Sequence, residues 1–479
     1  MKKQLFKYFL LIVCTLVLFQ CEEFLDESPR ALQSEDAAFL DEGTARLVVN
    51  GMYDPIAWGE SAQLATSHSY EFMFGDICTD DAEKGSTFSD YTDLALMKQF
   101  TVTATTGAVS AIWAKHWVAI NRANTVLRNL PGSPLDLSIK NEFEGEARFV
   151  RAYSYFTLLR IFGDLPLFET PVSPDDINDR NFQRASMAEI YAFIDADFQF
   201  AIDNLPVKST SNMGRANKGT AAAYLARSYM YQIGMENTAG RTWDQVLDIT
   251  TRFINGEYGS YALASNYATI FEVDGENNIE SIFEIQAVDN GVDPFSRGDY
   301  LGSEWTIFRN PQFMGGWGFA TPTADLANAY EDNDPRRHST LLAIGEHAYG
   351  IEMMVSERNH TGYYDRKAIE QPELWITDKG SGQNIRKFRY ADILLMNAEA
   401  AYHTGNAAQA IQRLTEIRER ASGSTYPKGF NPEDPNGYEA TSFASLDNSI
   451  IPSGGQDLLD FIYLERRREL GLEQLRFWD

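Results

Sequence analysis

Paired amphipathic helices are the feature of this sequence that most restricts its fold. Within residues 388–421, apolar side chains recur at helical spacing and form one face, made of Ala391, Leu394, Leu395, Ala398 and Tyr402. Gly405 ends this pattern, and a second face follows, made of Ala407, Ala410, Ile411, Leu414 and Ile417. Two antiparallel helices joined by a glycine turn over roughly 34 residues are typical of a tetratricopeptide-like unit.

The same arrangement recurs earlier in the chain. Helical stripes lie near 111–128 and 187–204, and the segments 217–233 and 243–255 resemble the pair described above. Each pair leaves an apolar face that only a neighbouring pair can cover, so we expect several units to stack around one core. A looser bundle of αα-hairpins is the alternative.

Between the helical regions the pattern changes. Residues 257–387 are rich in Gly, Asn, Asp and aromatic residues and contain only short β-like runs such as 281–287. We predict one predominantly all-α domain over 35–479, with tetratricopeptide-like repeat helices at about 111–256 and 388–479. Long irregular loops with a few short strands fill the insert, and binding residues tend to lie on such loops.

The N-terminus predicts the compartment. Residues 1–20 begin with three lysines and continue into an apolar stretch about half as long as a membrane-spanning helix requires, as in a secretory signal peptide. The signal runs directly into Cys21, as in a bacterial lipoprotein whose lipidated cysteine becomes the first mature residue. Residues 21–34 then form an acidic tether. A plain signal peptide cleaved nearby is the alternative, because Gln20 is larger than the residue usual at that position.

Charge and cysteine content exclude several classes of protein. The chain has 41 Lys and Arg against 68 Asp and Glu, a formal charge of −27, and loss of the three signal lysines leaves −30. Nucleic acids and anionic lipid surfaces repel such a chain, so we expect no nucleic-acid partner and membrane contact through the lipid anchor only. The three cysteines, Cys14, Cys21 and Cys78, are too few for a disulfide framework.

Motifs of catalysis and of metal binding are missing from the sequence. It contains no Gly-x-Ser-x-Gly elbow, no phosphate-binding Gly-Lys loop and no HExxH helix, and its six histidines are scattered. Calcium binding is conceivable at the Asp- and Asn-rich loops 274–278 and 331–334, but neither has the ligand spacing of a known calcium loop. We predict no catalytic residue, no cofactor and no metal.

One loop segment, at 70–91, interleaves aromatic rings with carboxylates. A flat ring can support the C–H face of a sugar while carboxylates accept hydrogen bonds from its hydroxyls. We predict that four residues of this segment bind a ligand: Tyr70, Asp80, Asp81 and Tyr91. The alternative is that Phe72 and Phe74 point into the core and that the acids are solvated.

A second aromatic segment lies at 305–319. Its aromatic residues are Trp305, Phe308, Phe313, Trp317 and Phe319. Trp317 stands in Gly-Gly-Trp-Gly, where the glycines remove competing side chains and leave the indole able to protrude. We predict Trp305 and Trp317 as ligand-binding residues, and packing of the indoles beneath a loop is the alternative.

Five stretches in order along the chain carry a resemblance to a known family. They are EARFVRAYSYFTLLRIFGDLPL (146–167), GRANKGTAAAYLARSYMY (214–231), GGWGFATPTADLANAYEDNDPRR (315–337), FRYADILLMNAEA (388–400) and IYLERRRELGLEQLRFWD (462–479). Taken together they resemble the SusD/RagB family of Bacteroidetes outer-membrane lipoproteins. Members of that family usually continue for some tens of residues beyond the last stretch, so we expect that a chain ending at Asp479 is a truncated product or an incomplete gene record.

The resemblance implies a function. It implies a non-catalytic, lipid-anchored protein on the outer face of the outer membrane, which binds oligosaccharides and delivers them to a SusC-like, TonB-dependent transporter. Some relatives handle peptides, so a peptide ligand is an alternative. A tetratricopeptide-type scaffold for a protein partner is another, and a glycan-degrading enzyme with two catalytic carboxylates is a third.

Several arginines lie on the family-like helices, where a guanidinium can join neighbouring helices or contact a transporter. We expect pairing with acids inside the protein to predominate. The residues are Arg148, Arg151, Arg160, Arg389, Arg466, Arg467 and Arg468.

Overall fold

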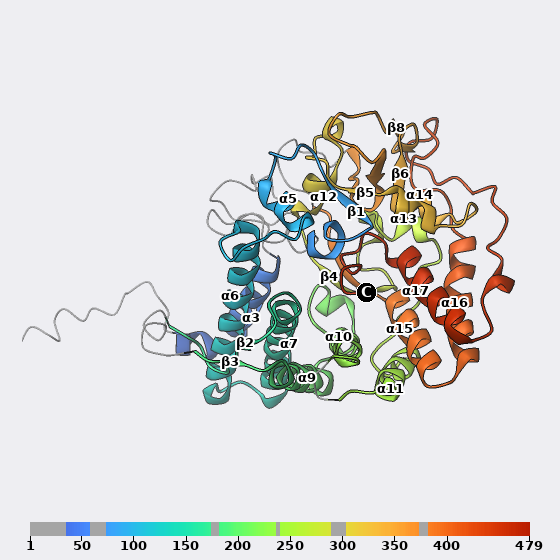
Figure 1. Cartoon of the computed structure of the whole chain (residues 1–479). Helices are drawn as coiled ribbons and strands as arrows, with labels where there is room; N and C mark the ends of the chain where they lie inside the picture. Colours follow the sequence, from blue (N-terminus) through green and yellow to red (C-terminus); the bar gives the residue numbers. More distant parts are fainter. Residues whose placement is uncertain (1–34, 58–72, 174–181, 236–239, 289–302, 373–381) are drawn as a thin grey trace, which may run out of the picture.

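Long helices from both ends of the chain form the frame of the molecule (Figure 1). The computed structural model describes residues 35–57, 73–173, 182–235, 240–288, 303–372 and 382–479. The long helices are α3 (Glu42–Ala57), α6 (Gly107–Asn129), α7 (Leu137–Phe162), α9 (Met187–Asn204), α10 (Lys218–Gln232), α11 (Trp243–Ile254), α15 (Tyr390–His403), α16 (Ala407–Ser422) and α17 (Gly455–Leu470).

These helices pack in chain order and build one continuous array. Helix α3 packs on α6, α6 on α7, α7 on α9, α9 on α10, α10 on α11, and α11 on α15, which also contacts α16 and α17. In Figure 1 the array runs from the blue α3 and the blue-green α6 through the green α9 and α11 to the orange and red α15, α16 and α17. The predicted stacking of helix pairs is confirmed, including the pairs α10–α11 and α15–α16.

Helix α7 is buried along much of its length because its apolar residues cover most of its circumference. The ring of Phe149 lies 5.8 Å from that of Phe198 on α9 and 5.7 Å from that of Tyr224 on α10. Phe149 and Phe198 are fully buried, and each such side chain contributes roughly 2–3 kcal/mol of hydrophobic stabilisation. The helix ends at Gly163, whose φ of +72° suits a residue without a Cβ.

Short strands and helices form the rest of the described structure. The short helices are α5 (Thr92–Lys98), α12 (Glu304–Arg309), α13 (Ala324–Ala329) and α14 (Arg336–Thr340). The strands are β1 (Ala82–Gly85), β2 (Leu165–Pro166), β3 (Arg184–Ala185), β4 (Ser281–Ile285), β5 (Phe319–Pro322), β6 (Leu341–Ala343), β7 (His347–Ala348), β8 (Ile351–Glu352), β9 (Tyr363–Asp365) and β10 (Ile385–Arg389).

The strands form two-stranded antiparallel sheets: β1–β5, β2–β3, β4–β10, β6–β9 and β7–β8. The β-like run predicted near residue 281 is confirmed as β4. Residues 388 and 389, which the sequence assigned to a helix, belong to β10 because they pair with β4. Figure 1 shows that α12, α13, α14 and β6 gather with α5 and β1 along one side of the helical array, at the top of the view.

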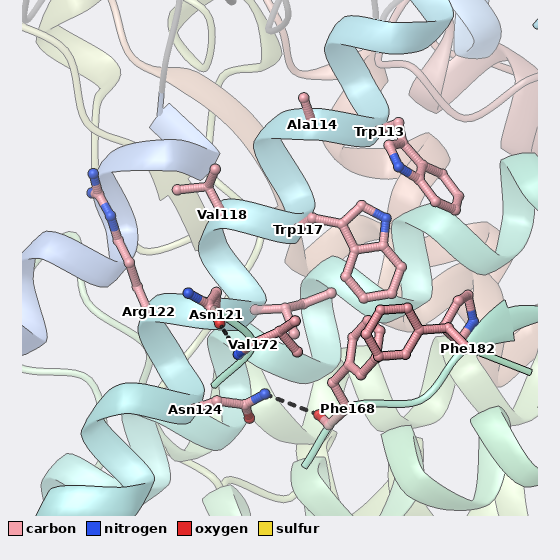
Figure 2. Close-up of a pocket in the computed structure, with 12 residues that line it drawn as sticks. Trp113, Ala114, Trp117, Val118, Asn121, Arg122, Asn124, Phe168, Val172 and Phe182 are labelled. Atoms are coloured by element: carbon pink, nitrogen blue, oxygen red, sulfur yellow. Dashed lines mark hydrogen bonds between the residues drawn. The ribbon is translucent and has the colours of Figure 1, made fainter. Parts of the chain in front are cut away.

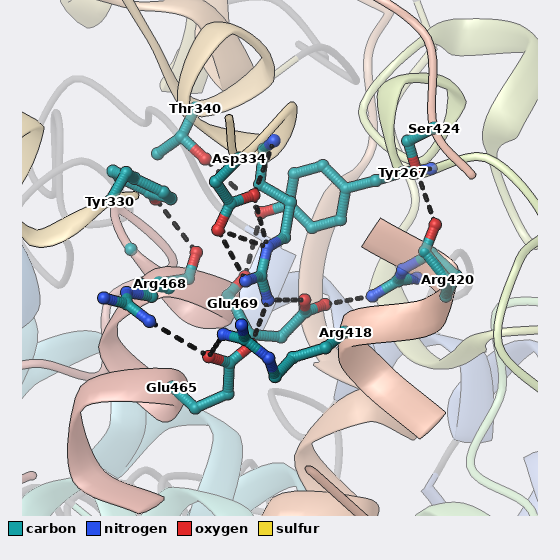
Figure 3. Close-up of polar contacts among 12 residues, drawn as sticks. Tyr267, Tyr330, Asp334, Thr340, Arg418, Arg420, Ser424, Glu465, Arg468 and Glu469 are labelled. Carbon is teal, nitrogen blue, oxygen red and sulfur yellow. Dashed lines mark hydrogen bonds and ion pairs between the residues drawn. The ribbon is translucent and has the colours of Figure 1, made fainter. Parts of the chain in front are cut away.

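A network of buried ion pairs joins these short helices and strands to the C-terminal helices (Figure 3). Arg336 on α14 pairs with Glu465 at 2.7 Å and with Glu469 at 3.1 Å, both on α17. Arg420 on α16 also pairs with Glu469. Burial disfavours the charge of Glu469, but the guanidinium of Arg420 and its neighbours outweighs this effect and lowers its pKa to about 2.

The predicted role of the family-like arginines in helix pairing is confirmed for most of them. Their partners are Asp197 for Arg148 and Arg151, Asp392 for Arg466, Asp81 for Arg467, Glu331 for Arg468, and Glu280, Glu469 and Glu473 for Arg389. Arg160 instead lies over two aromatic rings, 4.4 Å from the centroid of Phe156 and 4.3 Å from that of Trp478. Within the described ranges, none of the helices combines the length and the apolarity needed to cross a lipid bilayer.

Candidate functional site

A short strand pair brings the two predicted aromatic segments together. Strand β1 pairs with β5 so that Gly85 lies opposite Phe319. Tyr91 follows β1 along the chain, and Trp317 closely precedes β5. The pairing therefore places the rings of Tyr91 and Trp317 side by side, with their centroids 5.6 Å apart.

Only glycine fits at position 85 of this strand pair. Its φ is +73°, and a Cβ there would lie 2.2 Å from the carbonyl oxygen of Gly318. Side chains rarely adopt this backbone conformation, and no Cβ approaches an oxygen so closely. The close approach of β1 and β5 therefore depends on Gly85.

We call Tyr91, Phe308, Trp317 and Phe319 the aromatic cluster. Phe308 lies 4.4 Å from Trp317 and 5.5 Å from Tyr91, and Phe319 lies 5.6 Å from Tyr91. Phe308 and Phe319 are buried, whereas Tyr91 and Trp317 are half-buried. The two phenylalanines thus form a base on which the tyrosine and the indole lie with part of each ring exposed.

The backbone around Trp317 is fixed to helix α12. The amide of Trp317 donates to the carbonyl of Ile307 at 2.8 Å, and that of Gly318 donates to the carbonyl of Asn310 at 2.9 Å. A Cβ on Gly316 would lie 2.3 Å from the Cβ of Asn310. The glycines therefore let this loop lie against α12. The indole of Trp317 packs on Phe308 and is half-buried, an outcome between the protrusion and the packing beneath a loop that the sequence left open.

Tyr91 has an unusual backbone conformation. It precedes α5 with φ +48°, in the left-handed region, which costs a residue other than glycine roughly 1–2 kcal/mol. Contacts of its ring with Phe308, Trp317 and Phe319 offset this cost. Such strained residues are concentrated at functional sites.

Polar groups lie in the loop between β1 and Tyr91. The hydroxyl of Ser86 donates to Asp90 Oδ2 at 2.6 Å, and Lys84 Nζ donates to the carbonyl of Thr87 at 2.7 Å. Burial lowers the pKa of Lys84, and the charge of Asp90 opposes this shift. The aromatic cluster thus has a carboxylate and a hydroxyl in the adjoining loop.

Trp305 lies in the interior, not on the exposed part of the aromatic cluster. Only 9% of its surface is exposed. Its ring covers the guanidinium of Arg309, whose carbon lies 3.7 Å from the ring centroid. Arg309 is itself buried and pairs with Asp76 and Asp365. The surface of Trp305 that remains for a ligand is therefore small.

Asp80 and Asp81 are held by arginines near the end of the chain. Arg476 donates to both oxygens of Asp80, at 2.8 and 2.7 Å, and the hydrogen bonds with Arg476 lower the pKa of Asp80 to about 2. Asp81 is buried against Arg467, and burial raises its pKa to about 6. These two predicted residues join the loop to the C-terminal region.

Two further predicted residues, Tyr70 and Cys21, lie outside the described residues. Of the six predicted ligand-binding residues, the structure therefore brings together Tyr91 and Trp317. Sequence reasoning named their partners Phe308 and Phe319 as aromatic but did not select them.

No metal centre is visible in the part of the chain that the structure describes. No three His, Cys, Asp or Glu side chains gather there in an arrangement that could hold an ion. In the loop 331–334, Glu331 pairs with Arg418 at 2.6 Å and Asp334 pairs with Arg336 at 2.6 Å. Arginines thus already neutralise these two acids.

The structure also contains a cavity that sequence reasoning missed (Figure 2). This α6 pocket has a volume of about 710 Å³ and lies between helix α6 and four residues that follow α7 in the chain, Pro166, Phe168, Val172 and Phe182. Its aromatic lining residues are Trp113, Trp117, Phe168 and Phe182. Trp113 and Trp117 lie one helical turn apart in the stripe near 111–128, a spacing that predicts one face of a helix but does not indicate whether a cavity lies against that face.

Two family models match this chain. A model described as "Starch-binding associating with outer membrane" matches residues 23–230, and the SusD family model matches residues 351–479. Both models thus match, in order, the two ends of the helical array. The chain belongs to the SusD/RagB family. The resemblance identified in the sequence is thereby confirmed.

Curated relatives and solved structures agree with this assignment. SusD-like protein P2 of Formosa agariphila is 24% identical over 489 residues, which cover 98% of this chain and 88% of that protein. The structure of a laminarin binding SusD-like protein is similar, with 25% sequence identity and a TM-score of 0.72. The match covers 92% of this chain and 90% of that protein's chain. Surface glycan-binding protein A from Bacteroides fluxus, at 24% identity, shares the fold with a TM-score of 0.73 and coverages of 92% and 88%.

Proposed function

We propose that this SusD/RagB member is a non-catalytic protein that binds oligosaccharides at the aromatic cluster. The observation that carries the proposal is the pairing of two half-buried rings, Tyr91 and Trp317, on a buried base of Phe308 and Phe319. The C–H face of a pyranose packs on such flat rings, which have already lost conformational freedom. The loop that holds Ser86 and Asp90 supplies partners for sugar hydroxyls.

Neutral glucans are the ligands to examine first. One structural relative, at 25% identity, is named a laminarin binding protein, and one matching family model is described as starch-binding. A shallow surface buries little area, and a flexible oligosaccharide loses conformational entropy when it binds there. We therefore expect dissociation constants of roughly micromolar to millimolar size.

Isothermal titration of the soluble mature chain with laminarihexaose, maltohexaose and a set of peptides tests the proposal. We expect binding to at least one oligosaccharide, and a loss of at least about tenfold in affinity for Trp317→Ala. Trp243→Ala is the matched control, because Trp243 is also half-buried and stacks on His403, with ring centroids 4.2 Å apart. Binding of peptides alone, or equal affinities of the Trp317 and Trp243 variants, would contradict the proposal.

We also propose that the mature chain is anchored to the outer membrane through a lipid on Cys21 and delivers its ligand to a TonB-dependent transporter. The signal-like residues 1–20, which end directly before Cys21, and the outer-membrane description of the family support this role. In cells, Cys21→Ala should move the protein from the membrane fraction to the soluble fraction. Affinity purification of the wild-type protein should recover a transporter of that class, and recovery of none would oppose the delivery role.

A further inference from the structure

The α6 pocket is a cavity, separate from the aromatic cluster, with the properties of a small-molecule site. Its volume of about 710 Å³ falls within the roughly 300–1,000 Å³ usual for such sites. Helix α6 and the residues Pro166, Phe168, Val172 and Phe182 supply the described lining, and none of the described lining residues belongs to the aromatic cluster. The two sites can therefore be occupied and altered independently.

Four aromatic rings line the pocket in a series of edge-to-face contacts (Figure 2). The ring centroids of Trp113 and Trp117 lie 5.3 Å apart, those of Trp117 and Phe168 5.2 Å, and those of Phe168 and Phe182 4.8 Å. All four side chains are half-buried. Because these four rings line the cavity, a flat ring that enters it meets aromatic surface.

Hydrogen bonds fix the wall opposite α6. Asn124 Nδ2 donates to the carbonyl of Phe168 at 2.9 Å, and the amide of Val172 donates to Asn121 Oδ1 at 2.7 Å. Asn124 Oδ1 in turn accepts from the buried Arg151 at 2.8 Å. These bonds hold the backbone at Phe168 and Val172 against the helix.

The lining indicates the polarity of the ligand. Among the described lining residues only Arg122 is charged, and its Nη1 already donates to the carbonyl of Gly51 and to Asp54. Most of the others are apolar: Ala114, Val118, Ile120, Pro166 and Val172. Apart from Asn121 and the indole N–H of Trp117, the described lining has few polar groups left for a ligand. Most hydroxyls of a buried sugar would therefore lose water without gaining a hydrogen bond, at a cost of about 1–3 kcal/mol for each.

We propose that the α6 pocket binds an uncharged aromatic ring of phenol or indole size, between Trp113, Trp117, Phe168 and Phe182. Asn121, at the polar side of the lining, can donate through Nδ2 to an oxygen on that ring. This ring is either a free small molecule or an aryl group carried on a sugar. The site goes beyond the proposed oligosaccharide site and does not depend on it.

Calorimetric titration of the full mature chain with 4-methylphenol tests the proposal. We expect one binding site, and at least tenfold weaker binding of benzoate, which has similar size but carries a charge. Tighter binding of 4-methylphenyl β-D-glucoside than of 4-methylphenol identifies an aryl sugar as the ligand source, and weaker binding identifies the free ring.

Two variants locate the site. Ala114→Phe fills the cavity from helix α6, and Phe168→Ala removes one aromatic wall while leaving the backbone carbonyl that Asn124 binds. Both should weaken 4-methylphenol binding at least tenfold, with folding checked by thermal unfolding. Trp317→Ala should bind 4-methylphenol as the wild type does, even where it has lost oligosaccharide binding. No binding to the wild-type chain, or unchanged binding to a folded Ala114→Phe variant, would overturn the proposal.

Discussion

The ring of Tyr91 lies 5.6 Å from that of Trp317, with an angle of 35° between the two planes. The two residues belong to segments far apart in the sequence, and the strand pair β1–β5 holds those segments together. Each ring also contacts Phe308 beneath it. Because they share this support, the tyrosine and the indole form one surface.

We expect Tyr91→Ala and Trp317→Ala each to weaken oligosaccharide binding about tenfold, or about 1.4 kcal/mol. The double variant should lose less binding free energy than the two single variants lose together, because removal of one ring already disturbs the packing of the other. A coupling of about 0.5–1.5 kcal/mol is usual for aromatic pairs in contact. Calorimetric titration of the four proteins in a double-mutant cycle measures it. Strictly additive losses would show that the rings act separately.

Gly85→Ala should destabilise the β1–β5 pair. The left-handed backbone costs roughly 1–2 kcal/mol, and the new Cβ would clash with the carbonyl of Gly318, 2.2 Å away. We expect the free energy of unfolding, measured in urea, to fall by more than about 2 kcal/mol in total. Oligosaccharide binding should also become weaker.

Gly345→Ala is the matched control for this strain. Gly345 also has a left-handed backbone, with φ +90°, but a Cβ added there would have no neighbouring atom within 4 Å. The Gly345→Ala variant should lose about 1–2 kcal/mol of unfolding free energy and bind the oligosaccharide as the wild type does. Equal losses in the two variants would mean that the contact with Gly318 relaxes without cost.

Glu399 should make the protein less stable as the pH rises from about 4.5 to 7. Burial raises the pKa of this carboxyl from 4.5 to about 7, so between these values the unfolded chain has lost a proton that the folded chain retains. Raising the pH therefore favours the unfolded state, by about 3 kcal/mol in total. The stability that comes from the uncharged carboxyl of Glu399 is therefore fully present below pH 4.5 and is lost above pH 7.

Glu399→Gln should remove this pH dependence because the amide does not titrate. Relative to the wild type, we expect similar stability at pH 4.5 and a gain of up to about 3 kcal/mol at pH 8, measured by urea unfolding. Glu352→Gln is the control, since Glu352 is exposed. A constant difference between Glu399→Gln and the wild type across this pH range would contradict the assignment.

Arg389→Ala should be among the most destabilising single changes. Arg389 is 2% exposed and pairs with Glu280, Glu469 and Glu473. Its removal leaves buried carboxylates without their partner, which costs about 3–5 kcal/mol. Thermal and urea unfolding measure the loss.

The comparison variant for this change is Arg252→Ala. Arg252 also pairs with acids, but its side chain is 45% exposed and that of its partner Glu257 is 49% exposed. Exposed pairs contribute about 0–1 kcal/mol, so we expect a small loss. Similar losses for the two arginines would mean that burial does not govern the strength of these pairs.

Much of the frame could be predicted from the sequence because helix formation and helix pairing are local. The apolar spacing in 217–233 and 243–255 predicted the helices that the structure has as α10 and α11. The apolar faces on either side of Gly405 predicted α15 and α16. The error at residues 388 and 389 arose where a local helical pattern was overridden by pairing with β4, a contact between distant segments.

The candidate site was predictable only in part. Their residue types made Tyr91, Trp305 and Trp317 equally good candidates for ligand binding. Only tertiary packing decides that Trp305 covers Arg309 and is 9% exposed. Asp80 was selected as a possible hydroxyl acceptor, and its pairing with Arg476 depends on how the C-terminal region folds back. The α6 pocket was missed because a helical stripe gives no sign of whether its opposite wall fills or leaves a space.

The sequence by itself determined the helix-pair frame, the family, and the aromatic character of the two loop segments, since residue spacing and chemistry along the chain carry that information. The tertiary structure decided which aromatic residues form a surface. That choice rests on Gly85 allowing β1 to approach β5, and on Phe308 and Phe319 supporting Tyr91 and Trp317. Contacts between distant segments fix burial and pairing, and these contacts exist only once the chain has folded.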